Sequence, residues 1–169
     1  MAANQALWAD VKRDLEAAKQ SLLLAAERAE TLKSRGNKMK PDVRFDRELA
    51  VGKLLHDCYG AMEAAMQRLV DAIDGGRPTG EDYHAQLIVR AGSVIPDLRP
   101  AMISKATAKD LQALRGFRHA VRHAYGEFDY DRAAPNVPIA RRAVASFQKD
   151  ITAFAKALKI LPQRYVEER

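Results

Sequence analysis

Hydrophobic residues recur at steps of three and four along most of this chain, a spacing that predicts amphipathic helices packed through one face. The first such stretch runs from about Gln5 to Leu32, and the breaker segment Ser34–Asn37 follows it. The second runs from about Asp42 to Ile73, and the turn-forming segment Asp74–Pro78 ends it. Both stretches therefore predict long helices that pack against each other.

The second half of the chain predicts three more helices. A shorter one lies between residues 79 and 91, and the last follows the breaker segment 135–138 and reaches about Ile160. Between them, Ala108 to Tyr125 forms a fourth periodic stretch, which Gly126 stops. No segment shows the alternation of apolar and polar residues that is typical of strands. The prediction is an all-α, up-and-down bundle of four long helices plus a shorter one, as one domain over residues 1–169.

The start of the fourth helix carries a recognisable capping pattern. Thr107 stands before the first periodic residue, and Asp110 follows at the position of a capping box. On a helical wheel centred on Phe117, the small and apolar residues Ala113, Leu114, Ala120, Val121 and Ala124 form the arc expected to be buried. Leu111 falls at the edge of this arc, which is where a partner helix is expected to pack.

The charge balance points to an anionic partner. The chain has a net charge of +6, and residues 105–123 hold five Lys or Arg against one acid, Asp110. This distribution favours nucleic acid. A single cysteine, Cys58, excludes an internal disulfide and a cysteine-based zinc site, and its expected role is that of a small buried apolar residue. Neither a signal peptide nor a membrane span is apparent, so a cytoplasmic setting without membrane contact is expected.

The segment Phe117–Tyr125 holds two Arg, two His and one Tyr without any acid. Histidine transfers protons near neutral pH, and arginine makes bidentate contacts with phosphate. This combination suits the cleavage of a phosphodiester without a metal or other cofactor. Two other interpretations exist: a solvated basic helix face, and a zinc site at His119 and His123. The flanking Arg118 and Arg122 would repel a cation, which disfavours zinc.

The wheel separates two of these residues. Arg118 and His123 lie on one side of the helix opposite the expected core, but they diverge in direction. They could converge on one phosphate if the helix distorts near Gly126, or if a two-fold axis brings a second copy of the helix alongside. We favour the second arrangement, because a homodimer would concentrate positive charge in one cleft.

The spacing of Arg118, His123 and Tyr125 resembles the RxxxxHxY motif of HepT-type toxins in the HEPN superfamily. The segments Asp74–His84 and Pro96–Pro100 resemble the corresponding helix–loop–helix of that family. The resemblance implies a HEPN bundle that dimerises through the motif helix. It also implies a metal-independent endoribonuclease of a toxin–antitoxin pair, with RNA as substrate and a minimal nucleotidyltransferase as the cognate antitoxin.

The resemblance also suggests roles for individual residues. Arg118 is expected to clamp the phosphate and His123 to act as general base or acid, with His119, Arg122 and Arg115 in support of RNA binding. Tyr125 resembles the tyrosine that the antitoxin modifies with AMP.

Further interpretations remain open at this point. Tyr125 could instead be a partly buried residue at a helix end, and His84 could be a packing residue or line the cleft. The whole chain could be a non-catalytic HEPN module that presents a nucleotide or substrate to a nucleotidyltransferase. A structural helical adaptor is the third possibility, and the acid-free Arg/His arc disfavours it.

Overall fold

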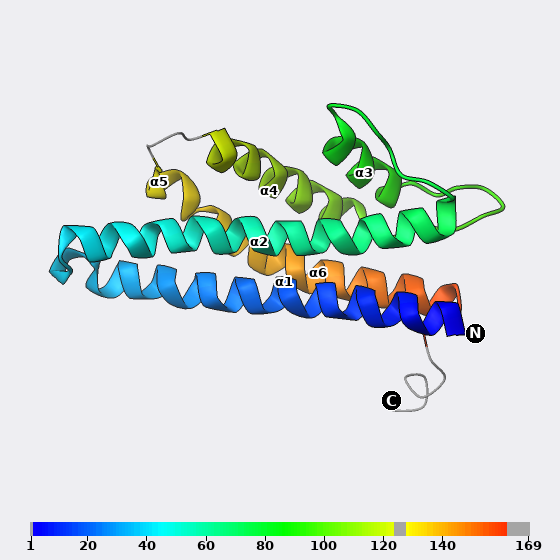
Figure 1. The fold of residues 1–169 in the computed structure, drawn as a ribbon, viewed down its shortest axis with the longest axis horizontal. Helices are drawn as coiled ribbons and strands as arrows, with labels where there is room; N and C mark the ends of the chain where they lie inside the picture. Colours follow the sequence, from blue (N-terminus) through cyan, green and yellow to red (C-terminus); the bar gives the residue numbers. More distant parts are fainter. Residues whose placement is uncertain (1, 124–127, 162–169) are drawn as a thin grey trace.

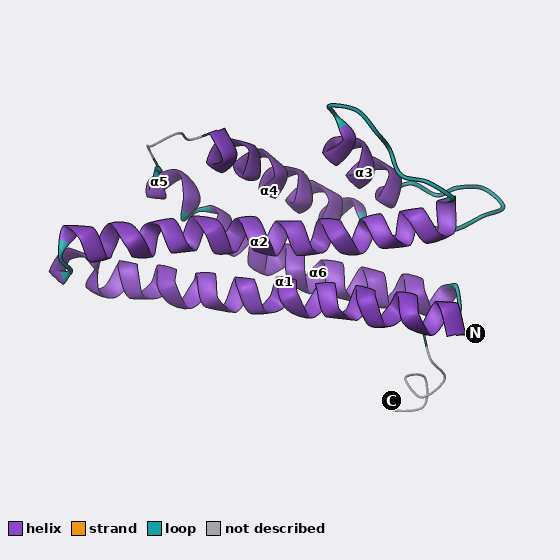
Figure 2. Ribbon diagram, in the orientation of Figure 1, coloured by secondary structure: helices purple, strands orange, loops and turns teal. Residues whose placement is uncertain are grey.

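The computed structural model describes residues 2–123 and 128–161, with side chains described for residues 4–117 and 128–161. Within these ranges the chain is helical and contains no strand (Figure 2). The elements, in chain order, are α1 (Ala2–Arg35), the 3₁₀ turn η1 (Gly36–Lys38), α2 (Pro41–Asp74), α3 (Tyr83–Gly92), α4 (Lys105–His123), α5 (Tyr130–Ala133) and α6 (Asn136–Ala157). The predicted all-α bundle of four long helices and a shorter one is confirmed. The single turn α5 was not predicted.

The long helices α1 and α2 form an antiparallel hairpin that runs the length of the molecule (Figure 1). Helix α6 lies behind this hairpin and packs against α1, α2 and α4, while α3 and α4 lie along α2. The turn η1 and the C-terminal end of α4 are at the same end of the bundle, and α5 lies between them. The N-terminus is at the opposite end.

The core lies between α1, α2, α4 and α6. Helix α2 supplies most of its large side chains, since its apolar positions recur around more than one face. Fully buried residues from the four helices include Val11, Leu55, Met62, Leu69, Leu111, Leu114, Phe147 and Ile151. Cys58 belongs to this core, and burial raises the pKa of its thiol to about 12. The expected role of Cys58 as a small apolar residue is therefore confirmed.

Helix α2 ends where the sequence predicted. Gly75 follows it with φ of 75°, the left-handed conformation that glycine adopts most readily at a helix C-terminus. Among the described residues, none of the helices is both long and apolar enough to cross a membrane.

Helix α4 begins earlier than predicted, and its capping differs. The helix starts at Lys105, and the Ser104 hydroxyl accepts a hydrogen bond from the Thr107 amide at 3.2 Å. Thr107 is instead completely buried and donates from its own hydroxyl to Asp150 of α6 at 2.6 Å. Asp110, predicted to complete a capping box, pairs with Arg142 of α6 at 2.9 Å. Both residues therefore fasten α4 to α6.

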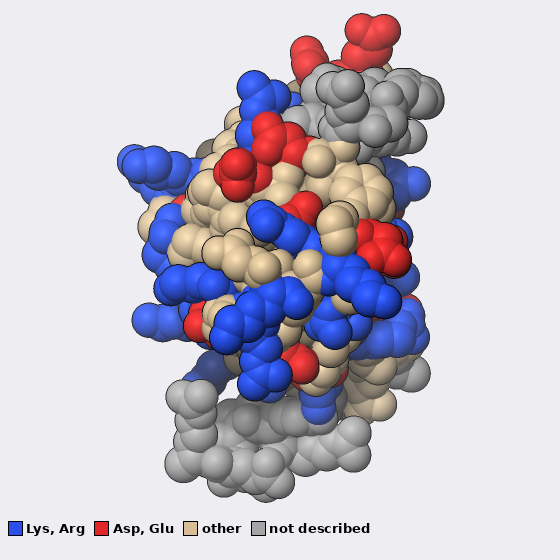
Figure 3. Space-filling view, turned by 90° about the vertical axis from the view of Figure 1, so that its left-hand side faces the viewer, with Lys and Arg blue, Asp and Glu red and all other residues tan. Residues whose placement is uncertain are grey.

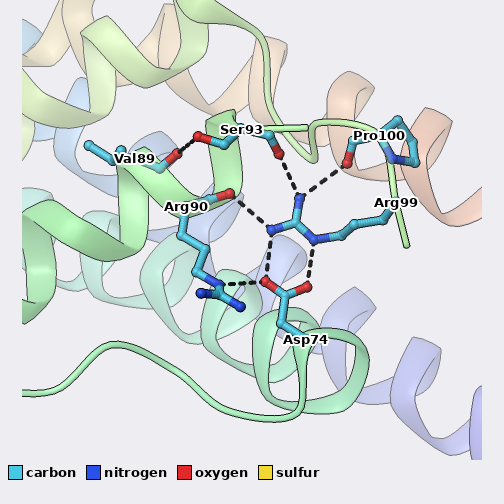
Figure 4. A network of polar contacts seen from close by, with 6 residues as sticks. All are labelled: Asp74, Val89, Arg90, Ser93, Arg99 and Pro100. Atoms are coloured by element: carbon cyan, nitrogen blue, oxygen red, sulfur yellow. Dashed lines mark hydrogen bonds and ion pairs between the residues drawn. The ribbon is translucent and has the colours of Figure 1, made fainter. Parts of the chain in front are cut away.

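A buried ion pair holds the connection between α3 and α4 against the end of α2 (Figure 4). Arg99 donates two hydrogen bonds to the carboxylate of Asp74, from Nε at 2.6 Å and from Nη2 at 2.8 Å, and both side chains are fully buried. The Arg99 guanidinium also donates to the carbonyls of Arg90, Ser93 and Pro100. Arg90 adds a third bond to Asp74 at 2.7 Å. These contacts set the point from which α4 begins.

Candidate functional site

The basic motif occupies the last turns of α4. The backbone of α4 carries Arg118, His119, Arg122 and His123, whose side chains lie outside the described residues. Tyr125 lies entirely outside the described part of the chain. The motif residues are therefore close in sequence on a single helix, and their convergence on one phosphate stays a prediction.

The face of α4 that meets the core differs from the predicted one. Leu111 is completely buried within its own chain, although it was expected at an edge available to a partner helix. Ala113, expected in the buried arc, is exposed. Leu114 and Phe117 are buried as predicted, but the stripe that packs on α2 and α6 is centred on Leu111 and Leu114 rather than on Phe117.

Arg115 is the candidate whose side chain is described. It is half-buried on α4, and its Nε donates to the Oε1 atom of Gln112, one turn earlier, at 2.9 Å. This neutral partner leaves the charge of Arg115 uncompensated by a direct ion pair in the described structure. Arg115 therefore contributes positive charge next to the motif.

The chain that follows the motif returns onto α2. Phe128 packs directly over Gly52, where a Cβ atom would overlap the ring of Phe128. Two residues after Phe128, at the start of α5, burial raises the pKa of Tyr130, and the nearby charge of Glu48 raises it further. The absence of a side chain at Gly52 thus lets the segment after α4 lie close to the first half of α2.

His84 is part of a polar contact between α2 and α3, far from the motif. Its Nδ1 atom contacts the carboxylate of Glu63, which is only 4% exposed. The ring of Tyr83 lies beside it with 4.6 Å between ring centroids, and Gln67 donates to the Tyr83 hydroxyl. A packing role for His84 fits this arrangement, since Glu63 and Tyr83 both hold it against the bundle.

No group of three or more His, Cys, Asp or Glu is placed to hold a metal ion within the described ranges. The pair His119 and His123 lies outside this search, because neither side chain is described.

The architecture and the α4 motif together define an all-α bundle of the HEPN type. The family described as "HepT-like protein" matches residues 50–158, a range that extends from the first third of α2 through the whole motif and α6. The chain therefore belongs to the HepT-like family, and the resemblance found in the sequence is confirmed. No curated protein matches the chain, and no solved structure does.

Proposed function

We propose that this protein is the toxin of a toxin–antitoxin pair and cleaves RNA as a metal-independent endoribonuclease. The observation that carries the proposal is the sequence spacing of Arg118 and His123, in the last turns of α4, and of Tyr125 two residues further along, in a chain of the HepT-like family. Membership of the family supports the toxin context, and the acid-free composition of the motif supports an anionic substrate.

The chemistry uses the nucleophile that RNA carries. His123 takes the proton of the 2′-hydroxyl as the 2′-oxygen attacks phosphorus, and the bond from phosphorus to the 5′-oxygen breaks. The leaving 5′-oxygen takes a proton from water, which leaves a 2′,3′-cyclic phosphate and a 5′-hydroxyl. Arg118 stabilises the charge that develops on the phosphate oxygens, with His119, Arg122 and Arg115 as further contacts to the RNA. In the proposed homodimer, two copies of α4 related by a two-fold axis together supply the Arg and His residues of one active site.

Cleavage of RNA in the presence of EDTA tests the proposal. The wild-type protein is expected to cleave a mixed-sequence RNA, while the Arg118→Ala, His123→Ala double variant is expected to be inactive. The matched control is Arg141→Ala, Lys149→Ala, which removes two exposed cations from α6. Equal cleavage by the wild type and the motif variant would contradict an active site at α4. Binding of a nucleotide or nucleotidyltransferase without cleavage would indicate the non-catalytic HEPN module.

The proposed silencing mechanism places the modification on Tyr125. A nucleotidyltransferase antitoxin would transfer AMP from ATP to the Tyr125 hydroxyl and release pyrophosphate. The added phosphate brings negative charge beside the basic motif and opposes RNA binding. Incubation with the cognate nucleotidyltransferase and ATP is expected to raise the mass by one adenylyl group, with loss of cleavage. The same gain of mass in Tyr125→Phe would place the modification elsewhere.

A further inference from the structure

A cluster of exposed cations covers the end of the bundle where α1 turns into α2. Figure 3 shows Lys and Arg side chains gathered over the middle and lower part of this face. We define the basic end as Lys33, Arg35, Lys38 and Lys40, all of which are exposed. In the described part of the chain, none of these four residues lies within ion-pair distance of a carboxylate.

The composition of this turn differs from that of other exposed surfaces. Residues 33–44 hold five Lys or Arg and a single acid, Asp42, and of the five only Arg44 forms an ion pair in the described part of the chain, with Glu48 at 2.7 Å. Elsewhere an exposed cation is often balanced, as where Lys53 pairs with Asp57 at 2.5 Å. Like charges held together without counterions create a positive potential that attracts a polyanion. The basic end therefore fits a phosphate backbone better than a small neutral ligand.

An exposed aromatic residue follows these cations closely in the sequence. Phe45, one turn into α2, is 45% exposed. A phenyl ring that is nearly half exposed offers an aromatic face to a ligand, and aromatic faces near cations are the arrangement on which unpaired bases stack. This second feature favours a single strand with accessible bases over a duplex or an acidic protein surface.

The basic end lies on the same side of the molecule as the motif. Both η1 and the C-terminal end of α4 are at one end of the bundle (Figure 1). The ring of Phe128, shortly after the motif, rests on Gly52 of α2. The rise of an α-helix puts Gly52 about 16 Å from Pro41, where α2 begins. A strand bound at the basic end can therefore continue toward the motif within a few nucleotides.

We propose that the basic end and Phe45 together bind single-stranded RNA and lead the strand toward the C-terminal end of α4. The cations hold the phosphates, and Phe45 stacks on a base. This inference rests on the proposed function and deepens it, since it names unpaired RNA as the class of substrate and gives the surface that holds it outside the reacting atoms.

Fluorescence anisotropy with a labelled 2′-O-methyl oligouridine of about ten nucleotides tests this proposal. Lys38→Ala, Lys40→Ala is expected to raise the Kd severalfold and to reduce the slope of log Kd against log salt by about 1.4, because each lost phosphate contact removes about 0.7. Phe45→Leu is expected to raise the Kd about fivefold without change in the salt slope. Phe45→Tyr, which keeps the aromatic face, is expected to bind as the wild type does.

The matched control is Lys149→Ala, Lys156→Ala, which removes the same charge from exposed positions of α6. An equal loss of RNA binding in both double variants would mean that the loss depends only on the net charge of the protein, and it would overturn the proposal. Intact RNA binding with loss of binding to the nucleotidyltransferase would also overturn it, since the surface would then serve a protein partner.

The probe separates this inference from the proposed function. A 2′-O-methyl strand lacks the 2′-hydroxyl nucleophile, so its binding does not depend on catalysis. Salt-dependent binding that requires the basic end, in a protein that does not cleave natural RNA, would support the inference and contradict the ribonuclease. If the protein cleaves natural RNA but the basic-end variants bind the probe as the wild type does, the ribonuclease would be supported and the inference contradicted. Circular dichroism of each variant should match the wild type, because all the replaced side chains are exposed.

Discussion

Arg99→Met is expected to lower the free energy of unfolding by about 3–5 kcal/mol, because it leaves the buried carboxylate of Asp74 without its principal partner. The guanidinium of Arg99 is fully buried and makes two bonds to Asp74. Methionine fills a similar volume without a hydrogen-bond donor, so the three carbonyls that Arg99 satisfies also lose their partner. Urea unfolding followed by circular dichroism measures the loss.

Arg90→Met provides the matched control for this substitution. Arg90 bonds to the same carboxylate, but its side chain is 40% exposed, and water can replace its single contact. Its expected cost is about 1 kcal/mol or less. Equal destabilisation by the two variants would mean that the ion pair with Arg99 has no special role in fastening the α3–α4 connection to α2.

The pH dependence of the wild type offers an independent check on Asp74. Burial by itself raises the pKa of this carboxyl group, but the hydrogen bonds and charges of Arg99 and Arg90 outweigh it and hold the pKa below 3.8. A depressed pKa stabilises the fold at pH values above that of the unfolded group. This contribution is lost as the pH falls from 3.8 through the lower pKa of the folded state. In Arg99→Met burial acts against a single remaining arginine, so the pKa of Asp74 lies less far below 3.8, and the acid-dependent loss should be smaller and complete at a higher pH.

Arg118→Ala and His123→Ala, tested singly, are each expected to slow RNA cleavage by about 10²–10⁴-fold. Arg118 stabilises developing charge and His123 transfers a proton, so either loss removes one contribution to the transition state. The pH profile distinguishes the two roles. The limb of the pH–rate profile that reports the titration of the catalytic histidine should disappear in His123→Ala and remain in Arg118→Ala.

An equimolar mixture of the two inactive variants is expected to recover about one quarter of the wild-type activity. If each site takes Arg118 from one subunit and His123 from the other, half of the dimers are mixed, and each mixed dimer holds one intact site. Refolding the variants together allows the subunits to exchange. Absence of recovery would place both residues of a site in one subunit, and a monomer by light scattering at micromolar concentration would exclude the shared site.

Much of the fold could be predicted because the apolar residues of this chain report burial directly. The seams of α1, α2 and α6 recur at helical spacing, and Gly75 marks the end of α2 with the conformation that its position requires. The beginning of α4 was misplaced for a physical reason. Threonine is a residue type that often caps helices, but the hydroxyl of Thr107 donates to the carboxylate of Asp150 instead. Asp150 is distant in sequence, and only the packing of α4 on α6 brings it near.

The candidate site was only partly accessible to the same reasoning. The Arg and His residues of α4 stand out because acids are absent around them, but the buried stripe of the helix depends on its neighbours. Leu111 was therefore assigned to an edge rather than to the core. The basic end escaped notice because its residues belong to two helices and the turn between them. A count of charges over residues 33–44 would have found it.

Helices α1 and α4 run in the same direction (Figure 1), which has a practical consequence for experiments on the intact protein. Helix α1 starts at the end of the bundle remote from the motif (Figure 1), and its 34 residues span about 50 Å. An affinity tag or a surface tether attached before Ala2 would therefore leave the motif facing solution. Immobilised protein prepared in this way should capture nucleic acid and partner proteins without obstruction by its own support.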